Sequence, residues 1–444
     1  MIEKSIVIIL RIYFIKTILY DIMIKNISRR EVRNSMQDVI NLIVKVRLYP
    51  TADQIKQFKA VTEAFRNLLN DVSQWYFDNH FKVDRRKFQK DMYYTLRSKY
   101  PQLNSLMIQS AFRCINARYK SVATQLHKQP YHYQDINTNK WYTQYKDLEW
   151  LQKPIFFSRP QADYVRRLNY SFVKDHQMIS MNGLGKRIKV AYNTAALKDL
   201  LNDETRLGTA KLICVKKRWF LHIPVKTTYT KWCKDNNYQI VGIDRGLRQI
   251  MTVYDNYGKT QFFNGRKVAY LRRKYHYLRQ QLQKCGTKSA KRHLKRLNHR
   301  ENRYINDINH QLTKTLVGHY GKNTLFVLED LSNVTFEKKR TNKQQTRDLH
   351  SWSFYDLQQK LTYKALLNQC NVITVEAAYT SQRCPKCAQI TKEARDHHLH
   401  LYQCPYCGYC TNDDRIGAMN LYELGKQYLL GDNDPHFEKL NAHD

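Results

Sequence analysis

The sequence predicts a multidomain α/β protein, and three observations lead to this fold class. Strand patterns alternate with helical patterns across residues 236–431, as expected for an α/β core. A cassette of paired cysteines, residues 381–410, interrupts that core. Before it, residues 37–232 place strand patterns on both sides of a helical region. With 444 residues the chain is long enough for more than one domain.

The first 35 residues differ from the rest of the chain. They are apolar but broken by charged residues at five positions, namely Lys4, Arg11, Lys16, Asp21 and Lys25. No apolar run therefore approaches the ~20 residues that a membrane span requires. No small-residue cleavage site follows, which argues against a signal peptide. We predict that residues 1–36 are a non-native or disordered extension derived from upstream sequence, with an interfacial helix as the alternative.

Strands and helices then alternate up to residue 232. A strand pattern begins at Val44, and Thr51 can cap a helix whose apolar periodicity runs to Tyr76. Residues 81–127 alternate basic and apolar side chains at helical spacing, whereas residues 128–165 are predicted to be irregular. Strand patterns return at Ile188–Tyr192, Ala210–Val215 and Trp219–Val225.

The predicted core follows a polar linker at Thr230–Asn237. Its strands are predicted at Ile240–Ile243, Gln249–Tyr254, Thr260–Phe263, Leu325–Leu328 and Val372–Ala377. A helix at Phe354–Asn368 separates the last two strands, and another helix starts near Asp414. This is the element order of a ribonuclease H-like α/β fold. Residues past Gly431 are predicted to form a loose polar tail.

Three acidic residues mark the ends of these elements. Asp244 and Glu329 each end a strand, and Asp414 begins the last helix. A carboxylate at the end of a central strand is fixed in space while its head faces a crevice, and Mg²⁺ prefers such oxygen ligands. A single acid could equally cap a helix or flank a turn. The ordered set instead predicts two Mg²⁺ ions that support phosphodiester hydrolysis; Asp413 is the adjacent alternative to Asp414.

The cysteine cassette predicts one structural zinc ion. Cys384 and Cys387 form one Cys-x-x-Cys pair, and Cys404 and Cys407 form the second. Four thiolates close a tetrahedron and leave no open position, so the zinc has no catalytic role. A disulfide pair or a redox motif is the competing interpretation. Four nearby residues are alternative ligands that the site does not need: Cys410, His397, His398 and His400.

The remaining cysteines are scattered and predict buried small hydrophobic residues rather than a disulfide framework, as in a cytosolic protein. They are Cys114, Cys214, Cys233, Cys285 and Cys370.

The charge balance indicates a polyanionic partner. The chain has 75 Lys and Arg residues against 38 Asp and Glu, a formal net charge of +37. Basic residues run along the whole length instead of flanking one apolar helix, so membrane binding is disfavoured. Residues 266–303 are predicted to form two long helices with basic outer faces and a break at Gly286. The 32 tyrosines include candidates for stacking on unpaired bases.

From about Val44 to Tyr422 the chain resembles the TnpB (OrfB) proteins of insertion sequences, relatives of the miniature type V CRISPR effectors. The matching stretches are VKVRLYPTADQ, RNLLN, GIDRGLRQIMTVYD, LEDLSNV, WSFYDLQQKLTYKA, YTSQRCPKC, CPYCG and NDDRIGAMNL. The resemblance places the RuvC-type catalytic triad on Asp244, Glu329 and Asp414, since Asp414 lies six residues before Asn420. Gly417 stands where the family usually has Ala.

The resemblance also implies a domain organisation. After the extension at 1–36, it comprises a wedge β-barrel (37–75 and 166–232), a helical recognition domain (76–165), a RuvC-like core (236–380 and 411–431), a zinc ribbon that binds target nucleic acid (381–410) and a tail (432–444). In the family, the wedge and recognition domains hold guide RNA and read a short motif beside the target.

The implied function is a transposon-encoded, RNA-guided and Mg²⁺-dependent DNA endonuclease. Its implied partners are a guide (omega) RNA and double-stranded target DNA, without a membrane, and a monomer is preferred over a homodimer. The expected location is the prokaryotic cytoplasm, in association with the nucleoid. A miniature CRISPR effector, a non-cleaving RNA-guided repressor and a true transposase remain alternatives; loss of a catalytic acid would favour the repressor, and all three acids are present.

Overall fold

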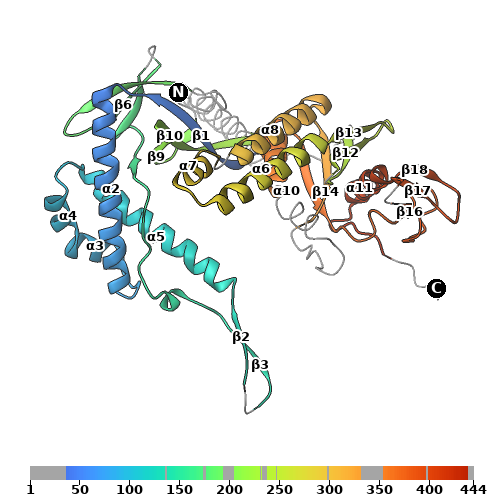
Figure 1. Cartoon of the computed structure of the whole chain (residues 1–444), viewed down its shortest axis with the longest axis horizontal. Coiled ribbons are helices and arrows are strands. Elements are labelled where there is room, and N and C mark those ends of the chain that lie inside the picture. Colours follow the sequence, from blue (N-terminus) through green and yellow to red (C-terminus); the bar gives the residue numbers. More distant parts are fainter. Residues whose placement is uncertain are drawn as a thin grey trace, which may run out of the picture. The chain divides into compact units, whose positions relative to one another are not determined.

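The computed structural model of the protein describes residues 37–135, 138–173, 177–193, 205–230, 232, 238–246, 248–297, 300–331, 354–396 and 399–438. The chain divides into two compact units. One comprises residues 39–227, and the other comprises residues 1–38 and 228–444. Figure 1 labels the elements, and each unit is described by itself. The predictions made for residues 1–36, Cys233, His397 and His398 fall outside the described residues.

Strand β1 (Gln37–Tyr49) and helix α2 (Ala52–Asp78) open the first unit. Thr51 caps α2 as the sequence predicts: its hydroxyl accepts from the Gln54 backbone N–H, and the Gln54 side chain accepts from the Thr51 N–H at 3.1 Å. This reciprocal pair satisfies two amide groups at the helix start. One face of α2 is fully buried in the unit's core, including Phe58 and Phe65.

The predicted helical region 81–127 divides into three helices. They are α3 (Arg85–Asp91), α4 (Tyr93–Lys99) and α5 (Ser105–His127). Pro101 cannot donate a backbone hydrogen bond, and Asn104 starts the next helix by accepting from the Met107 N–H at 2.9 Å. A helical period alone does not reveal these interruptions.

One eight-stranded sheet contains β1 and seven later strands. These are β4 (Gln161–Tyr164), β5 (Tyr170–Val173), β6 (Met178–Asn182), β7 (Arg187–Asn193), β8 (Arg206–Leu207), β9 (Ala210–Val215) and β10 (Arg218–Thr230). The order is β4-β9-β10-β1-β7-β6-β5, with β8 paired to β10. The sequence predicted β7, β9 and β10 but missed β4, β5 and β6, which have only four or five residues each.

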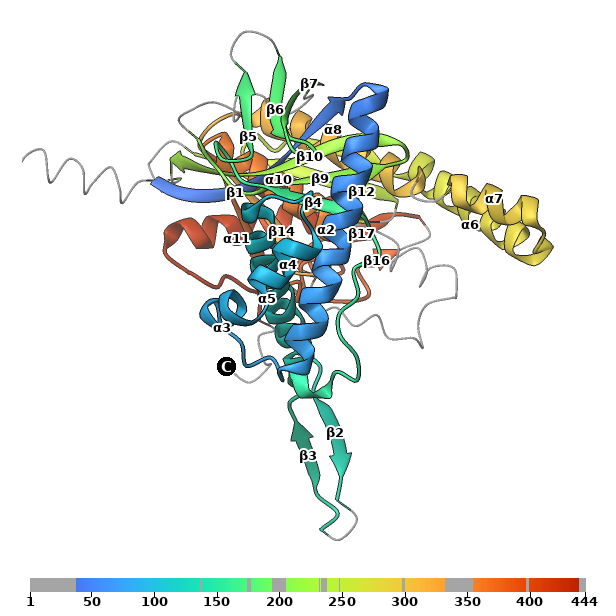
Figure 2. The ribbon, with the colours of Figure 1, turned by 90° about the vertical axis from the view of Figure 1, so that its left-hand side faces the viewer.

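The prediction that residues 128–165 are irregular was wrong. Besides β4, this region contains a hairpin of β2 (Tyr131–Gln134) and β3 (Trp141–Gln144) and the short 3-10 helix η1 (Leu148–Trp150). The hairpin extends beyond the end of α5 in both views (Figures 1 and 2). All eight strand residues are exposed, so the sequence lacks the apolar–polar alternation from which a strand is predicted.

The second unit contains a five-stranded sheet in the order β13-β12-β11-β14-β15. The strands are β11 (Gln239–Asp244), β12 (Gln249–Asp255), β13 (Thr260–Asn264), β14 (Thr324–Glu329) and β15 (Asn371–Val375). The first three are antiparallel neighbours, whereas β14 runs parallel to both β11 and β15. The five predicted strand positions are confirmed to within a few residues.

Helices cover both faces of this sheet. Helices α8 (Arg300–Tyr320) and α10 (Phe354–Leu367) pack on the face that carries Val241 and Ile243. Helix α11 (Asp413–Leu430) packs on the opposite face, against Ile240 and Val327. The central strands are apolar on both sides because both sides are covered.

The basic region 266–303 contains a helix break where the sequence predicts one. Helix α6 (Arg266–Cys285) ends at Gly286, whose φ of 63° lies in the left-handed region that suits glycine. Helix α7 (Lys288–Leu297) is only ten residues long, and α8 follows from Arg300, so the region holds three helix segments instead of two.

Two further predictions need correction. The residues after Gly431 are not uniformly a loose tail, because Phe437 is buried against the cluster that contains α11 and Arg383 lies over its ring. Cys370 is buried as expected and Cys114 is half-buried, but Cys214 and Cys285 are exposed. Among the described residues, no helix is long and apolar enough to cross a membrane.

Candidate active site

Two parallel strands bring Asp244 and Glu329 to the same edge of the five-stranded sheet. Strands β11 and β14 are adjacent, with Ile243 paired to Leu328, so each acid is the next residue along its strand. The carboxyl ends of neighbouring parallel strands meet at one edge, where α/β sheets commonly bind ligands. Both acids are partly exposed, whereas the residues before them are buried. The sequence prediction that they lie at strand ends is confirmed.

Helix α11 brings the third acid to Asp244. Two glycines allow the close approach: a Cβ on Gly242 would lie 2.1 Å from the Ala418 carbonyl oxygen, and a Cβ on Gly417 would lie 2.8 Å from Asp244 Oδ2. Asn412 caps the helix by accepting from the Asp414 N–H at 3.1 Å. Asp414 therefore lies in the first turn, three residues before the helix position that touches Asp244.

Asp413 and Asp414 have different surroundings. The side chain of Asp413 is 2% exposed; it pairs with Arg395 Nε at 3.2 Å, and its Oδ1 lies 3.5 Å from His400 Nδ1. The side chain of Asp414 is 19% exposed and lies 3.7 Å from Arg395 Nη2. Asp413 is thus enclosed by protein groups, whereas Asp414 retains access to a ligand. This geometry supports Asp414 as the third site residue.

Burial and mutual repulsion raise the pKa of the Asp244 carboxyl well above its usual range. Desolvation is the largest cause, followed by the negative charges of Glu329 and Asp414, while Arg395 acts in the opposite direction. Desolvation also raises the pKa of Glu329, against the hydrogen bond from Thr380 and the charges of Arg245 and Arg395. A bound divalent cation would remove this penalty, and carboxylate oxygens are ligands that Mg²⁺ prefers.

Arg395 is a site residue that the sequence did not reveal. It lies in β16 (Arg395–Asp396), a strand of the cysteine-containing segment, yet it pairs with both Asp413 and Asp414. Its positive charge also reaches Asp244 and Glu329. It belongs to no recognisable spacing pattern, and only the packing of this segment against α11 brings it to the acids.

Thr380 and Asn420 fix the position of Glu329. The Thr380 hydroxyl donates to Glu329 Oε1 at 2.6 Å. Asn420, fully buried in α11, donates through Nδ2 to the carbonyl oxygens of Thr380 and Arg383, both at 2.8 Å. The Asn of the family motif thus connects α11 to the segment that holds Glu329.

Arg245 stabilises the same edge of the sheet through hydrogen bonds. It is 6% exposed and donates to the Glu329 carbonyl oxygen, the Phe354 carbonyl oxygen and Gln358 Oε1. Desolvation lowers its pKa to about 10 despite the nearby acids. It joins β11, β14 and α10 directly behind the two strand-end carboxylates.

The four predicted cysteines converge and fit a zinc ion. Their sulfur atoms all lie within 4.8 Å of one another, with Cys384 and Cys407 at 3.6 Å and Cys387 and Cys404 at 3.5 Å. Zinc–sulfur bonds of about 2.3 Å place tetrahedral sulfurs about 3.8 Å apart. In the part of the chain that the structure describes, no other group of three or more Cys, His, Asp or Glu ligand atoms forms such a cluster.

Two similar turns hold the four sulfur atoms. In the first, the Ala388 N–H donates to the Cys384 carbonyl oxygen; in the second, the Gly408 N–H donates to that of Cys404. Ala388 and Gly408 both have positive φ, 63° and 69°. Strands β16, β17 (Leu401–Gln403) and β18 (Cys410–Asn412) complete a small sheet. Neither Cys410 nor His400 belongs to the cluster.

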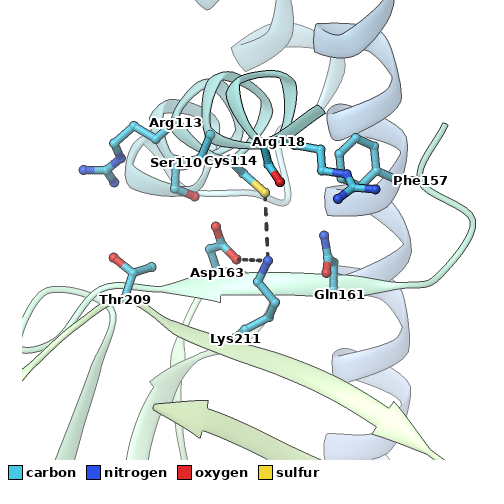
Figure 3. Close-up of a pocket in the computed structure, with 11 residues that line it drawn as sticks. Ser110, Arg113, Cys114, Arg118, Phe157, Gln161, Asp163, Thr209 and Lys211 are labelled. Atoms are coloured by element: carbon cyan, nitrogen blue, oxygen red, sulfur yellow. Dashed lines mark hydrogen bonds and ion pairs between the residues drawn. The ribbon is translucent and has the colours of Figure 1, made fainter. Parts of the chain in front are cut away.

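The first unit contains a separate cavity of about 560 Å³ between α5 and the edge strand β4. Lys211 lies between Asp163 and Cys114, 3.8 Å from the carboxylate and 3.9 Å from the sulfur atom (Figure 3). Asp163 is 6% exposed, and burial raises its pKa against the charges of Lys211 and Arg113. Arg113 and Arg118 line the helix side, so the cavity is predominantly basic.

These features define a chain with a carboxylate-edged α/β sheet and a four-cysteine insertion, and family comparisons agree. Residues 222–335 match the OrfB IS605 family, described as "Probable transposase". Residues 354–421 match the "Cas12f1-like, TNB domain" family. The first match contains Asp244 and Glu329; the second contains the four cysteines and Asp414.

Individual relatives show the same resemblance. A CRISPR-associated endodeoxyribonuclease Cas12f1 of Sulfoacidibacillus thermotolerans is 35% identical over 124 residues, 28% of this chain and 25% of the relative. The InsQ protein of Escherichia coli, whose name proposes an RNA-guided DNA endonuclease, is 26% identical over 247 residues, 51% and 60% of the two chains. A TnpB-like protein of Acanthamoeba polyphaga mimivirus is 20% identical over 433 residues, 90% and 76% of the two chains.

The chain thus matches less than two thirds of the length of the first two relatives. A solved structure, the cryo-EM structure of a Cas12f1–sgRNA–target DNA complex, has the same fold with a TM-score of 0.50 and 11% identity, covering 87% of this chain and 99% of that one. The resemblance to TnpB proteins and Cas12f1 effectors is confirmed.

Proposed function

We propose that the protein is an RNA-guided DNA endonuclease of the transposon-associated TnpB kind. One observation supports the proposal: two adjacent parallel strands and the start of α11 place Asp244, Glu329 and Asp414 close enough for the charges of Glu329 and Asp414 to act on Asp244, and Arg395 from the cysteine segment pairs with Asp414. The names of the InsQ and Cas12f1 relatives support this class of activity.

The proposed fold of the second unit is a ribonuclease H-like, RuvC-type core. Its sheet order 13-12-11-14-15 has three antiparallel strands followed by two parallel ones, with helices on both faces. Asp244 and Glu329 lie at the carboxyl ends of the adjacent parallel strands β11 and β14, where this architecture exposes polar groups to a ligand. The four-cysteine segment is the proposed zinc ribbon, and its zinc is structural.

The chain's own residues divide the proposed chemistry between them. Two Mg²⁺ ions, when held by the three carboxylates, would activate the attacking water and stabilise the leaving oxygen of the phosphodiester. Glu329 is oriented by Thr380, and Asp244 by contact with Gly417. Arg395 lies at the site with its guanidinium paired to Asp414, where it can also attract the substrate phosphate. Asp413 holds Arg395 in place.

Nucleic-acid binding is proposed to use the basic helices and the first unit. Helix α7 exposes five Lys and Arg residues and buries only Ala290 and Leu297. The α5–β4 cavity, with Arg113, Arg118 and Lys211, is the candidate site for reading the motif beside the target. Guide RNA and double-stranded DNA remain the proposed partners, with base pairing supplying sequence specificity.

Cleavage of a guide-matched plasmid tests the proposal. Asp244→Ala, Glu329→Ala and Asp414→Ala should each abolish cutting but leave RNA and DNA binding nearly intact, because affinity comes from many basic side chains. Asp413→Asn, which keeps the size of the side chain, should retain more activity than Asp414→Asn. Cutting by the Asp244→Ala or Glu329→Ala protein, or RNA-independent cutting by the intact protein, would contradict the assignment.

A further inference from the structure

The β2–β3 hairpin carries an exposed array of aromatic rings that the proposed nuclease site does not use. Tyr131, Tyr133 and Tyr142 share one side of the hairpin because Tyr133 pairs directly with Tyr142 and Tyr131 lies two residues before Tyr133. Trp150 adjoins Tyr131, with ring centroids 6.1 Å apart. We call these four residues the ring face. Each of the four residues is between 41% and 48% exposed.

This arrangement needs a partner. Among the described residues β2 and β3 pair only with each other, and an isolated two-stranded hairpin is at best marginally stable in water. Its strands, YHYQ and WYTQ, contain no aliphatic side chain that could form a core. Contiguous exposed aromatic groups mark binding surfaces. We propose that the ring face binds unpaired bases of RNA.

The spacing of the rings selects a single strand over a duplex. Tyr131 and Tyr133 have centroids 5.9 Å apart at an interplanar angle of 19°, and Tyr133 and Tyr142 have centroids 5.8 Å apart at 25°. Stacked bases in a duplex repeat every ~3.4 Å along a strand. Bases that each cover one ring must therefore be unstacked from one another, as in loops and bulges of RNA.

Charge favours a nucleic acid over a second copy of this chain. Neither strand contains an acidic residue. Lys140 and Lys146 flank β3, whereas Asp135 follows β2 and Asp147 and Glu149 precede Trp150, so the preference for a polyanion depends on the strands themselves and on the chain as a whole. Lys146 Nζ lies 5.5 Å from the centre of the Trp150 ring, where it can also meet a phosphate. Two chains that each carry a formal net charge of +37 repel each other, whereas a polyanion is attracted.

RNA fits better than DNA for two reasons. Unpaired loops are a permanent feature of folded RNA, whereas the bases of target DNA are stacked until the duplex opens. The ring face consists mainly of tyrosines, whose hydroxyl groups can bond the ribose 2′-hydroxyl that distinguishes RNA from DNA. The presence of an RNA partner rests on the proposed function.

The opposite side of the hairpin provides a matched control. Trp141 pairs with Gln134 and points away from the ring face, and it is 71% exposed. The test measures binding of short fluorescent oligouridine and oligothymidine strands at elevated salt, where general phosphate contacts contribute less. The double variant Tyr133→Ala/Tyr142→Ala should bind oligouridine about 10-fold or more weakly, since each lost base–ring stack is substantial. Trp141→Ala should change it by less than about 2-fold.

The variant Tyr133→Phe/Tyr142→Phe tests the choice of RNA. It should keep oligothymidine binding and lose only the preference for oligouridine. Unchanged melting temperatures for all variants are expected because these rings lie outside the core. Equal losses in the Ala pair and in Trp141→Ala, a loss confined to oligothymidine, or a dimer that the Ala pair dissociates would each overturn the proposal. Plasmid cleavage by the intact protein separately reports the nuclease function, so the two proposals can fail independently.

Discussion

Replacing Gly417 by alanine should slow DNA cleavage without unfolding the protein. A Cβ at this position would lie 2.8 Å from both Cγ and Oδ2 of Asp244 and 3.2 Å from its Cβ. Carbon atoms in contact settle at about 3.5–4.0 Å, so the Asp244 side chain must move by about 0.7 Å. Misplacement by about 1 Å can lower a rate about 100-fold, and we expect a loss of about 10- to 100-fold.

Gly425→Ala is the matched control on the same helix. A Cβ there would lie 2.6 Å from Ile240 Cγ2 and 2.8 Å from Val327 Cγ2, in the apolar packing and away from the acids. Both substitutions gain up to about 1 kcal/mol of helix propensity. Overpacking should cost Gly425→Ala about 1–3 kcal/mol of unfolding free energy and leave the cleavage rate of the folded protein intact.

The assay is single-turnover cleavage of a guide-matched plasmid by saturating protein–RNA complex, with urea unfolding of the same preparations. Gly417→Ala should lower the rate while its binding of RNA and target DNA stays unchanged. If Gly417→Ala cuts at the rate of the intact protein, or if both variants lose rate equally, contact with α11 does not position Asp244 and the reasoning is refuted.

Four further predictions rest on particular contacts. Arg395→Ala should lower thermal stability because it leaves Asp413 buried without its main partner, and it should also lower cleavage. The double variant Arg395→Ala/Asp413→Asn should recover the melting temperature but not the plasmid cleavage. Cys384→Ser should lower the zinc content, measured by metal analysis, by about one ion per chain. Ala388→Gly should stabilise the zinc-loaded segment by up to about 1–2 kcal/mol, because Ala388 has a φ of 63°, a left-handed conformation that glycine adopts without strain. Desolvation, Lys360 and Lys314 lower the pKa of Lys364 from 10.5 to about 8, so the charged side chain disfavours folding below pH 8. Urea unfolding should show stability rising between about pH 8 and 10.5, with a smaller rise in Lys364→Met.

Much of the second unit could be predicted from sequence because each signal was local. The buried parallel strands are short apolar runs in the sequence, and Asp244 and Glu329 come directly after those runs. The four cysteines have a spacing that fixes their pairing into two turns. The choice of Asp414 over Asp413 came from a family pattern, and the burial of Asp413 supplies an independent physical reason for it.

What could not be predicted depends on contacts between distant segments. Arg395 lies within an ordinary polar stretch, and only the packing of the cysteine segment against α11 makes it part of the site. The hairpin is invisible to hydrophobic periodicity because neither of its faces is buried.

Gly417 illustrates the same limit at the level of one atom. From sequence it is a small residue where the family usually has alanine, so exchanging the two looks harmless. In the structure the missing Cβ is the space that Asp244 needs, because Gly242 has already brought the backbone of α11 against β11. The close packing of α11 on β11 therefore also determines where the Asp244 carboxylate lies. A residue can thus matter to the site without contributing any side chain to it.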